Sequence, residues 1–587
     1  MAPFLNVSAS LTGRRWVGPS LEEDRLAEAM ARDARLDRAL ALALVRRGVG
    51  AAEAEGFLSP KLRDLLPDPL TLRDMAIAAD RLLRAALEGE RIAVFADYDV
   101  DGGAAAALLL GWLRALGARA TLYVPDRIEE GYGPNAPAMA RLAAAHDLIV
   151  CADCGTASHE ALAAAGGADV VVLDHHLGGE ALPPALAVVN PNRQDEGGEL
   201  GHLCAAAVVF LLLVEANRRL RAEGRAGPDL LAMLDLVALA TVADVAPLTG
   251  VNRALVRQGL LVMARRERPG LAALADVAGL SSAPTAYHLG YVLGPRVNAG
   301  GRVGRADLGA RLLATDDPHE ARALAERLDA LNGERRAIEA GVVAAALAQA
   351  EARGTDGPLA WAAGEGWHPG VVGIVAGRVK ERFNRPACVA GVSGGVAKGS
   401  GRSVPGVDLG SAVIAARQAG LLDSGGGHAM AAGFGFSMEK RDAVHAFLNE
   451  RLQRAAALPG AADLLVEGAV AVGAATTDLA LQVERLAPFG AGNEEPNFAL
   501  PRARVVRADR VGKEGNTVRA FLEGENGGGR LKAICFRAKE GPLAKALLGS
   551  GGAPLHLCGA LRAERWNGSV TACLHVVDAA PVPAGGG

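Results

Sequence analysis

Acidic and imidazole side chains follow directly after three apolar runs in the first third of the chain, at residues 91–96, 148–150 and 169–173. The residues concerned are Asp97, Asp99 and Asp101, then Asp153, then Asp174, His175 and His176. Carboxylates that lie close together repel one another and keep protons at neutral pH unless a positive charge lies among them. Carboxylates with imidazole and without thiolate are ligands that suit Mn²⁺ or Mg²⁺. These residue types therefore predict a divalent metal site.

Short, continuous apolar runs that alternate with Ala/Leu-rich helical stretches are typical of a buried parallel sheet with crossover helices. In such sheets ligands bind beyond the carboxyl ends of the strands, which is where these side chains fall. Residues 234–248 add an apolar helix with Asp244 near its end. An isolated Asp at a helix end is commonly a capping or surface residue, but beside the other three motifs it becomes a candidate ligand. The predicted ligands are Asp97, Asp99, Asp153, His175 and Asp244. This number of carboxylates predicts two ions, an arrangement that supports in-line displacement at phosphorus.

Length and composition indicate a globular protein of several domains. The chain has 587 residues, of which half are hydrophobic and 22% are charged, with a net charge of −4. That charge argues against a polycation that coats nucleic acid. No apolar stretch is long enough for a membrane span and no signal peptide is recognised, so we expect a cytoplasmic protein. Seven unevenly spaced cysteines predict no disulfide framework, and the Cys151–Cys154 pair lacks the second pair of a zinc ribbon.

Periodicity and Gly/Pro-rich breaks predict the domain organisation. The expected segments are a helical lead-in at 1–75, an α/β domain at 76–315, a connecting long helix at 316–355, a smaller α/β domain at 356–457, a β-barrel at 458–580 and a frayed tail at 581–587. Asp316 or Asp317 before Pro318 suits a helix start, and Gly354 suits its end.

Taken together, 97–102, 153–155, 174–176 and Asp244 resemble the four motifs of the DHH phosphoesterase superfamily. Residues 295–302 resemble the arginine motif of its RecJ family of bacterial single-strand-specific exonucleases. Further segments, at 367–376, 425–433 and 486–493, resemble the DHHA1 domain and the start of the OB-fold region of that family. The resemblance implies an α/β fold: a parallel-sheet DHH catalytic domain joined by a long helix to a smaller α/β DHHA1 domain, followed by a C-terminal OB-like β-barrel.

The resemblance also implies a function. The implied activity is that of a metal-dependent 5′-to-3′ exonuclease, which degrades single-stranded DNA to 5′-mononucleotides in recombination and DNA repair and uses two Mn²⁺ or Mg²⁺ ions. The implied partners are single-stranded DNA, a single-strand-binding protein and a helicase, and we expect a monomer without membrane contact. The catalytic candidates are Asp174, expected to orient the ring of His175, His176, expected to face the scissile phosphate, and Asp101.

Residues for substrate binding follow from the same motifs. They are Arg296, Asn298, Arg302, Ser400, Arg402, Gly426, Gly427, His428 and Tyr132, with Lys398 as a further cation. Arginine can grip a terminal phosphate with two parallel hydrogen bonds. Three of these features have a plainer alternative. Residues 425–433 form either a tight turn or a nest of amides, and residues 400–402 form either a solvated loop or an anion site. Tyr132 either packs in a loop or stacks on a base. His368 is expected to support the second lobe.

Three other functions share parts of this pattern. A DHH phosphoesterase for short oligonucleotides or cyclic dinucleotides would have the same metal motifs, but it would not need the C-terminal β region. A non-catalytic nucleic-acid-binding module would have lost metal ligands, which are intact here. A nucleotide-binding oxidoreductase would show G-x-G-x-x-G after the first strand, and this sequence does not.

Overall fold

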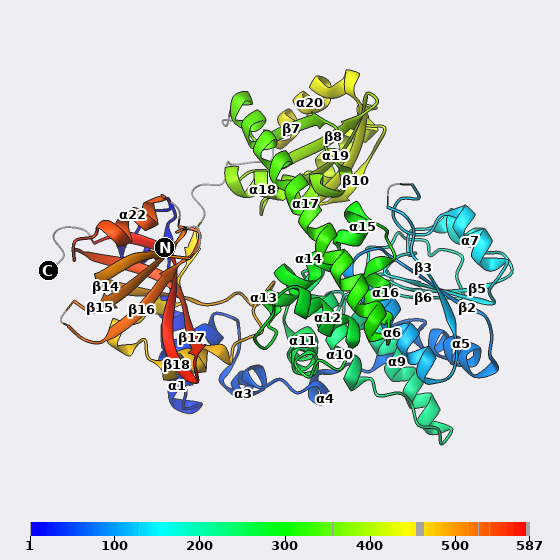
Figure 1. Ribbon diagram of the computed structural model, residues 1–587, viewed down its shortest axis with the longest axis horizontal. Helices are drawn as coiled ribbons and strands as arrows, with labels where there is room; N and C mark the ends of the chain where they lie inside the picture. Colours follow the sequence, from blue (N-terminus) through cyan, green and yellow to red (C-terminus); the bar gives the residue numbers. More distant parts are fainter. Residues whose placement is uncertain are drawn as a thin grey trace. The chain divides into compact units, whose positions relative to one another are not determined.

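A computed structural model describes residues 2–127, 129–354, 357–453, 463–512, 515–525, 527–538 and 540–582. The chain forms two compact units (Figure 1). The barrel unit contains Met1–Leu66, Pro247–Ala254 and Gly460–Gly587, and the two-sheet unit contains Pro67–Ala246 and Leu255–Pro459. None of the helices in the described part of the chain combines the length and apolar character needed to span a bilayer.

The first sheet of the two-sheet unit is wholly parallel, with strand order β3-β2-β4-β5-β6. Its strands are β2 (Ile92–Ala96), β3 (Ala120–Tyr123), β4 (Leu148–Ala152), β5 (Asp169–Leu173) and β6 (Ala187–Val189). Its helices are α5 (Met75–Glu88), α6 (Val100–Ala115), α7 (Ala136–Ala143), α8 (His159–Ala163) and α9 (Ala205–Ala222). Every residue of β2 and β4 is buried, which explains their continuous apolar sequences.

A group of mostly short helices follows the parallel sheet, drawn in green in Figure 1. It consists of α10 (Leu234–Ala243), α11 (Gly250–Met263), α12 (Pro269–Val277), α13 (Ala286–His288), the π-helix η5 (Leu289–Leu293), α14 (Gly294–Val297), α15 (Ala299–Val303) and α16 (Leu308–Ala314). Asp244 is the C-cap residue directly after α10, and α15 carries the end of the arginine motif.

Helix α17 (Pro318–Arg353) has 36 residues and begins at the N-cap Asp317, whose side chain accepts from His319 N–H. It contacts α12, α15 and α16 and also β7 and α18, so it joins the parallel-sheet domain to a second domain. That domain has a mixed sheet of order β10-β11-β9-β8-β7. Its elements are β7 (Ala360–Glu365), α18 (Pro369–Phe383), β8 (Ala387–Ser393), β9 (Val396–Arg402), α19 (Leu409–Gln418), β10 (Ser424–His428), β11 (Ala431–Ser437) and α20 (Arg441–Gln453).

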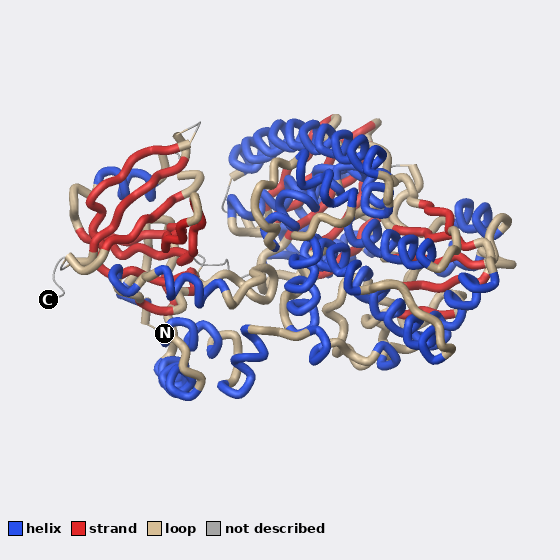
Figure 2. The backbone as a smooth tube through the Cα atoms, turned by 60° about the horizontal axis from the view of Figure 1, so that its bottom comes forward, coloured by secondary structure: helices blue, strands red, loops and turns tan. Residues whose placement is uncertain are grey.

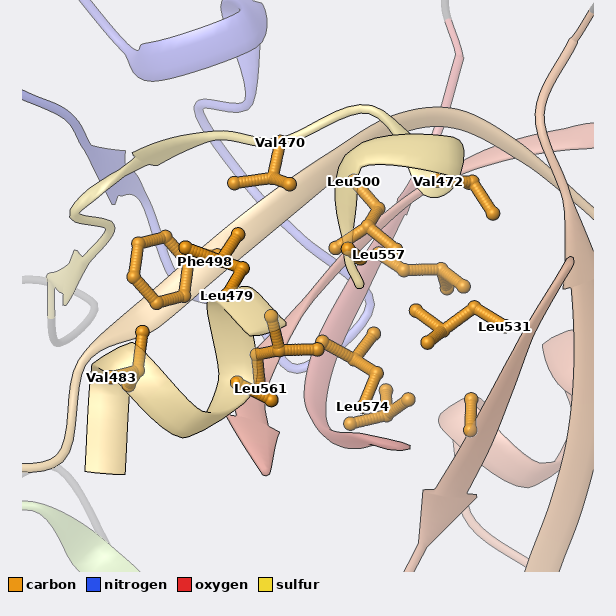
Figure 3. Close-up of a cluster of buried hydrophobic side chains, with 14 of the residues drawn as sticks. Val470, Val472, Leu479, Val483, Phe498, Leu500, Leu531, Leu557, Leu561 and Leu574 are labelled. Atoms are coloured by element: carbon orange, nitrogen blue, oxygen red, sulfur yellow. The ribbon is translucent and has the colours of Figure 1, made fainter. Parts of the chain in front are cut away.

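The barrel unit is built on five strands that close through a β14–β17 pairing, and the tube view shows them as a compact red group (Figure 2). Its elements are β12 (Leu464–Leu465), β13 (Gly468–Ala469), α21 (Thr477–Glu484), β14 (Asn497–Val511), β15 (Thr517–Glu523), β16 (Arg530–Cys535), α22 (Pro542–Gly549), β17 (Pro554–Trp566) and β18 (Ser569–Pro581). Apolar side chains such as Phe498, Leu557 and Leu574 fill its centre (Figure 3). Register shifts let β14, β17 and β18 bend through 15, 13 and 13 residues without ending.

The N-terminal segment folds onto this barrel. It contains β1 (Trp16–Val17), α1 (Leu21–Asp33), α2 (Arg38–Val45), α3 (Ala54–Leu58) and α4 (Leu62–Leu65). β1 pairs with β12, and the buried indole of Trp16 donates to Asp578 at 3.0 Å. The 247–254 segment joins the same unit through Arg253, which donates to the carbonyl oxygens of Leu486 and Phe57. Sequence reasoning treated the lead-in and the barrel as separate segments, but the structure combines them.

This architecture confirms the predicted fold class: a parallel-sheet domain, a long helix, a smaller α/β domain and a closed β-barrel. The predicted boundary at 457/458 lies outside the described residues. The predicted frayed tail is described only at 581–582, and Pro581 is the last residue of β18.

Candidate active site

The predicted metal ligands come together at the carboxyl ends of β2, β4 and β5 and at the end of α10. Three overlapping groups have ligand atoms within 4.8 Å of one another: Asp97, Asp99 and Asp153; Asp153, His175 and His176; and Asp101, His175 and Asp244. His175 Nε2 lies 3.3 Å from Asp153 Oδ1, and its Nδ1 lies 3.9 Å from Asp244 Oδ2. All five predicted ligands are therefore members of one continuous cluster.

Asp153 is held in a left-handed backbone conformation, with φ of 63°. Such a conformation costs a non-glycine residue on the order of 1–3 kcal/mol and persists only where the surroundings impose it. Here the N–H of Asp153 donates to Leu173 O at 2.9 Å, and the next residue but one, Gly155, has φ of 116°. A Cβ at Gly155 would lie 3.2 Å from the Val172 side chain, so glycine allows the close turn that presents the Asp153 carboxylate.

Mutual repulsion and burial keep protons on these carboxylates. Burial, and then the charge of Asp99, raises the pKa of Asp97 to about 8. Burial, and then the charges of Asp101 and Asp99, raises the pKa of Asp244 to about 8. Burial and four neighbouring carboxylates place the pKa of Asp153 well above its usual range. A positive charge among these groups would remove the repulsion.

The donor set fits divalent cations. Asp97 Oδ1 and Asp153 Oδ1 are buried without a hydrogen-bond partner, which is costly unless a cation satisfies them. The donors are carboxylate oxygens and imidazole nitrogens, as Mn²⁺ and Mg²⁺ prefer. Cys151 and Cys154 are buried and unpaired, and within the described residues neither joins a candidate metal group, which leaves the zinc alternative without support.

Asp174 contacts the ring of His176, not that of His175, and this corrects the predicted pairing. Its Oδ1 lies 2.8 Å from His176 Nδ1 and also accepts the backbone N–H groups of His175 and His176, while Oδ2 accepts from Thr156 N–H. Neighbouring side chains leave the backbone in different directions, so only one of the two rings can reach this carboxylate. Burial lowers the pKa of His176, but the hydrogen bond and charge of Asp174 outweigh it and raise the pKa.

Tyr132 belongs to the same network. Its hydroxyl lies 3.1 Å from His176 Nδ1 and 3.1 Å from Asp153 O, while the residue as a whole is 53% exposed. Burial of the hydroxyl and the nearby Asp153 charge raise the pKa of Tyr132, so it stays protonated. The residue thus combines a hydrogen bond to His176 with an open ring face, and both predicted alternatives for it were incomplete.

Asp101 is enclosed under the cluster. Its two carboxylate oxygens accept the N–H groups of Ala205 and Ala206, the first residues of α9, at 2.7 and 2.8 Å. Its Oδ2 is also 3.7 Å from His175 Nε2. A carboxylate in this position anchors a helix N-terminus and faces the imidazole of His175. This geometry favours a positioning role over the direct catalytic role predicted from the sequence.

A cavity of ≈ 530 Å³ lies between the parallel-sheet domain and the second domain. Its polar lining consists of Arg127, Arg302, Lys398, Ser400 and Arg402, and no carboxylate is among the described residues that line it. Burial and the charges of Arg127 and Arg335 lower the pKa of Arg302 to about 10, so the cations repel one another without losing their protons at neutral pH. The cavity is built to receive an anion.

Hydrogen bonds of the two arginines and a glycine in α18 shape this cavity. Arg402 Nη1 donates to Ser400 Oγ at 2.8 Å, and Arg302 Nη1 donates to Gly370 O at 3.0 Å. A Cβ on Gly373 would lie 3.1 Å from Arg402 Nη2 and 3.2 Å from Ser400 Oγ, so glycine in α18 leaves these groups open. The predicted anion site at 400–402 is therefore a strand facing a cavity, not a solvated loop.

Tyr98 connects the cavity with the carboxylate cluster. It stands between Asp97 and Asp99 in the chain, and a Cβ on Gly301, next to Arg302, would lie 2.9 Å from its carbonyl oxygen. The guanidinium of Arg127 lies over its ring, 5.1 Å from the centroid. Sequence reasoning missed Arg127, although it follows β3 just as the acidic motifs follow β2, β4 and β5.

Two residues of the arginine motif serve the fold. Arg296 Nε donates to Asp329 at 2.8 Å on α17, and its Nη1 donates to Val292 O. Asn298 Oδ1 accepts the N–H of Val100 at 3.0 Å, which holds the start of α6. Arg296 is buried in this ion pair and is not among the described residues that line the cavity, so its role in substrate binding stays a prediction that the cavity does not support.

Residues 425–433 form a β-hairpin: the glycine run at 425–427 lies in the edge strand β10, and a tight turn at Ala429 and Met430 leads into β11. The plainer of the two predicted alternatives, a tight turn, is therefore present. Gly426, Gly427 and His428 lie in β10 and pair in register with β11. A Cβ on Gly410 of α19 would lie 2.7–2.8 Å from the carbonyl oxygens of Gly427 and His428, so close helix–strand packing explains small residues here. His428 is exposed and does not line the cavity. His368 caps α18 by accepting from Gly370 N–H, as its expected supporting role requires.

Comparison with known proteins identifies the family. Residues 91–241 match the DHH family, N-terminal domain, residues 356–454 the DHHA1 domain, and residues 466–578 the RecJ OB domain. The chain is 39% identical over 506 residues to the single-stranded-DNA-specific exonuclease RecJ of Dickeya dadantii, covering 82% of this chain and 86% of that relative. The chain belongs to the RecJ family.

Solved RecJ structures have the same architecture. Those of Thermus thermophilus RecJ in complex with Mn²⁺ and with Mg²⁺ match with TM-scores of 0.78 and 0.74, at 30% and 29% identity. The matches cover 96% and 97% of this chain and 79% of each RecJ chain. The three predicted domain types and their order are thus those of RecJ.

Proposed function

We propose that this chain is a metal-dependent exonuclease that degrades single-stranded DNA from its 5′ end and releases 5′-mononucleotides. The observation that carries the proposal is the pairing of a carboxylate–imidazole cluster with a cavity lined by four cations, linked through Tyr98. The cluster can bind metals beside a scissile phosphate, and the cavity can bind a neighbouring terminal phosphate. Membership of the RecJ family supports the same substrate.

The cluster residues would hold two divalent cations, Mn²⁺ or Mg²⁺. We assign the ligand role to Asp97, Asp99, Asp153, His175 and Asp244. When bound, such cations supply positive charge beside the scissile phosphate. Asp101 positions His175 and α9, and Asp99 also caps α6 by accepting from Asp101 and Gly102 N–H.

His176 is the candidate proton donor. Asp174 and Tyr132 hold its ring, and Asp174 favours its protonated form. In that form the imidazolium can stabilise charge on the scissile phosphate or give a proton to the leaving 3′-oxygen. Because Asp174 holds Nδ1 and the Tyr132 hydroxyl lies within 3.2 Å of both ring nitrogens, little reorganisation is needed during the reaction.

The cavity explains the polarity. A 5′-terminal phosphate carries more charge and more free oxygens than an internal phosphodiester, and Arg302, Ser400 and Arg402 can donate to those oxygens. With that phosphate in the cavity, the next phosphorus faces the cluster. Water then attacks this phosphorus, the bond to the 3′-oxygen of the first nucleotide breaks, and the shortened strand begins with a new 5′-phosphate. Each step therefore regenerates the group that the cavity binds.

The barrel unit would hold the strand outside the active site. OB-folds bind single strands through cationic side chains and exposed aromatic rings. Phe536 and Trp566 are exposed on this barrel, and Arg504 and Arg507 are exposed cations of β14. A phosphoesterase for dinucleotides would have no use for this surface. Truncation near residue 458 would not test the role cleanly, because residues 1–66 and 247–254 share the core of the barrel unit. The variant Trp566→Ala should weaken affinity for long strands without slowing hydrolysis of short ones.

The family also suggests partners and a location for this protein. A single-strand-binding protein and a helicase would supply and protect the substrate in a cytoplasmic setting.

The decisive experiment uses purified protein with single strands labelled at either end, with and without Mn²⁺ or Mg²⁺. We expect labelled mononucleotide at once from the 5′-labelled strand, progressive shortening of the 3′-labelled strand, and no cleavage in EDTA. Mononucleotide release first from the 3′ end, or cleavage without a divalent cation, would overturn the proposal.

A further inference from the structure

Two tyrosines form an exposed stacked pair on the two-sheet unit. The rings of Tyr287 and Tyr291 have centroids 5.2 Å apart and planes 28° apart, and the residues are 57% and 70% exposed. The chain has only five tyrosines. Exposed aromatic rings are expensive to leave in water, and a stacked pair of them offers a flat apolar surface with two faces.

The pair sits on α13 and the π-helix η5, which pack against α10. A Cβ on Gly290 of η5 would lie 3.4 Å from Val242 Cγ1, and one on Gly294 would lie 3.4 Å from the Cβ of Ala243. Ala243 immediately precedes Asp244, a member of the metal cluster. π-helical turns interrupt α-helices at a cost and recur at functional sites. Tyr291 thus follows Gly290, which packs against α10, the helix that precedes Asp244.

One helical face leads from the pair to the cation-lined cavity. Residues 287, 291, 295, 298 and 302 are spaced by four, four, three and four, so they share one side of the nearly continuous helical run from 286 to 303. Arg302 lines the cavity, and Asn298 touches the start of α6. The eleven residues from Tyr291 to Arg302 correspond to roughly 16 Å at about 1.5 Å per residue.

We propose that Tyr287 and Tyr291 form a base-stacking platform for the substrate strand beyond the scissile phosphate. The inference rests on the proposed exonuclease function and assigns it a binding site for nucleobases about 16 Å from the terminal-phosphate cavity along this helical face. A strand stacked at about 3.4 Å per nucleotide covers that distance in roughly five nucleotides. Dinucleotides therefore cannot reach the platform, and longer strands can.

Continuity with the cavity selects this occupant. The surface begins at two apolar rings and ends at a guanidinium, which matches a polymer that carries a base and a phosphate in every unit. The stacking needs no base-specific hydrogen bond, as required of an enzyme that removes every nucleotide in turn. Tyr287 and Tyr291 are also the most exposed tyrosines among the described residues, so their rings are open to a ligand.

The test compares the full-length double variant Tyr287→Ala/Tyr291→Ala with Tyr287→Phe/Tyr291→Phe and with Leu261→Ala. Leu261 is an exposed apolar residue of α11 and controls for the loss of surface apolar area. The substrates are a 5′-phosphorylated dinucleotide and a 5′-phosphorylated strand of about 20 nucleotides. We expect the alanine pair to weaken binding of the long strand on the order of 10-fold, with hydrolysis of the dinucleotide unchanged. The phenylalanine pair and Leu261→Ala should behave as the parent protein.

A second readout is the fluorescence of 2-aminopurine placed in turn at positions two to eight of the long strand, measured without catalytic metal. Stacking on tyrosine should quench one or two positions in the parent and in the phenylalanine pair, but not in the alanine pair. Unchanged long-strand affinity and unchanged quenching in the alanine pair would overturn the platform, and equal losses on both substrates would reassign the tyrosines to folding of the site. A parent protein that hydrolyses neither substrate would refute the exonuclease proposal instead.

Discussion

The variant Arg402→Ala should lose most of the preference for a 5′-phosphorylated end. Both hydrogen bonds of Arg402 within the site, to Ser400 Oγ and Gly401 O, come from Nη1, which orients the fork with Nη2 toward the cavity side of Gly373. Burial leaves the Arg402 guanidinium poorly hydrated and, with the charge of Arg127, lowers its pKa. A hydrogen bond to a charged group contributes about 1.5–3 kcal/mol. The ratio of kcat/KM between 5′-phosphoryl and 5′-hydroxyl strands should therefore fall roughly 10- to 150-fold.

The assay measures kcat/KM for two strands that differ only at the 5′ group. Arg402→Lys keeps the charge without the planar fork and should lie between the parent and the alanine variant. Arg417→Ala removes an exposed arginine of α19 in the same domain and controls for net charge. If Arg402→Ala keeps the full preference, Arg402 does not bind the terminal phosphate and the assignment of the cavity is wrong.

Three further outcomes follow from the structure. Because the folded-state pKa of Asp97 and of Asp244 is raised to about 8, above the unfolded value of 3.8, the metal-free protein should lose thermal stability as pH rises from about 4 to about 8. Mn²⁺ should raise its melting temperature more at high pH than at low pH. If calorimetry shows a melting temperature of the metal-free protein that rises with pH, this prediction is wrong. His176→Ala should lose turnover while still binding Mn²⁺ in a calorimetric titration, since Asp174 holds it as a proton donor; loss of metal binding would place it among the ligands. Trp16→Ala should destabilise the barrel unit by about 3–5 kcal/mol, seen as faster hydrogen exchange in its strands, and unchanged exchange there would show that the buried indole is dispensable.

Strand ends were the most predictable part of the structure. The apolar runs stop at Ala96 and Leu173 in the sequence, and β2 and β5 end at the same residues. A sheet covered by helices on both faces requires apolar side chains, so the first polar residue marks the end of the buried part of a strand. The metal cluster follows from these ends and from the edge they share.

Side-chain partners were less predictable, because they depend on directions that the sequence does not encode locally. Asp174 was assigned to the ring of His175, but the backbone turn after β5 directs it to His176. Arg296 has the chemistry of a phosphate ligand, and only the arrival of α17 with Asp329 pairs it elsewhere. Arg127 was overlooked because an arginine after a strand is unremarkable until Tyr98 and Arg302 are beside it.

The pairing of the two chain ends in the barrel unit has a consequence for synthesis on the ribosome. Trp16 and its partner Asp578 are 562 positions apart, and at about 5–20 residues per second the second emerges roughly half a minute to two minutes after the first. During that interval Leu40, Leu42 and Leu44 of α2 have no barrel core to enter, although the two-sheet unit between them can already be folding. Until the barrel strands follow, these helices expose apolar surface of the kind that chaperones bind. One part of the barrel unit is thus made before the two-sheet unit, and its strands are made after it.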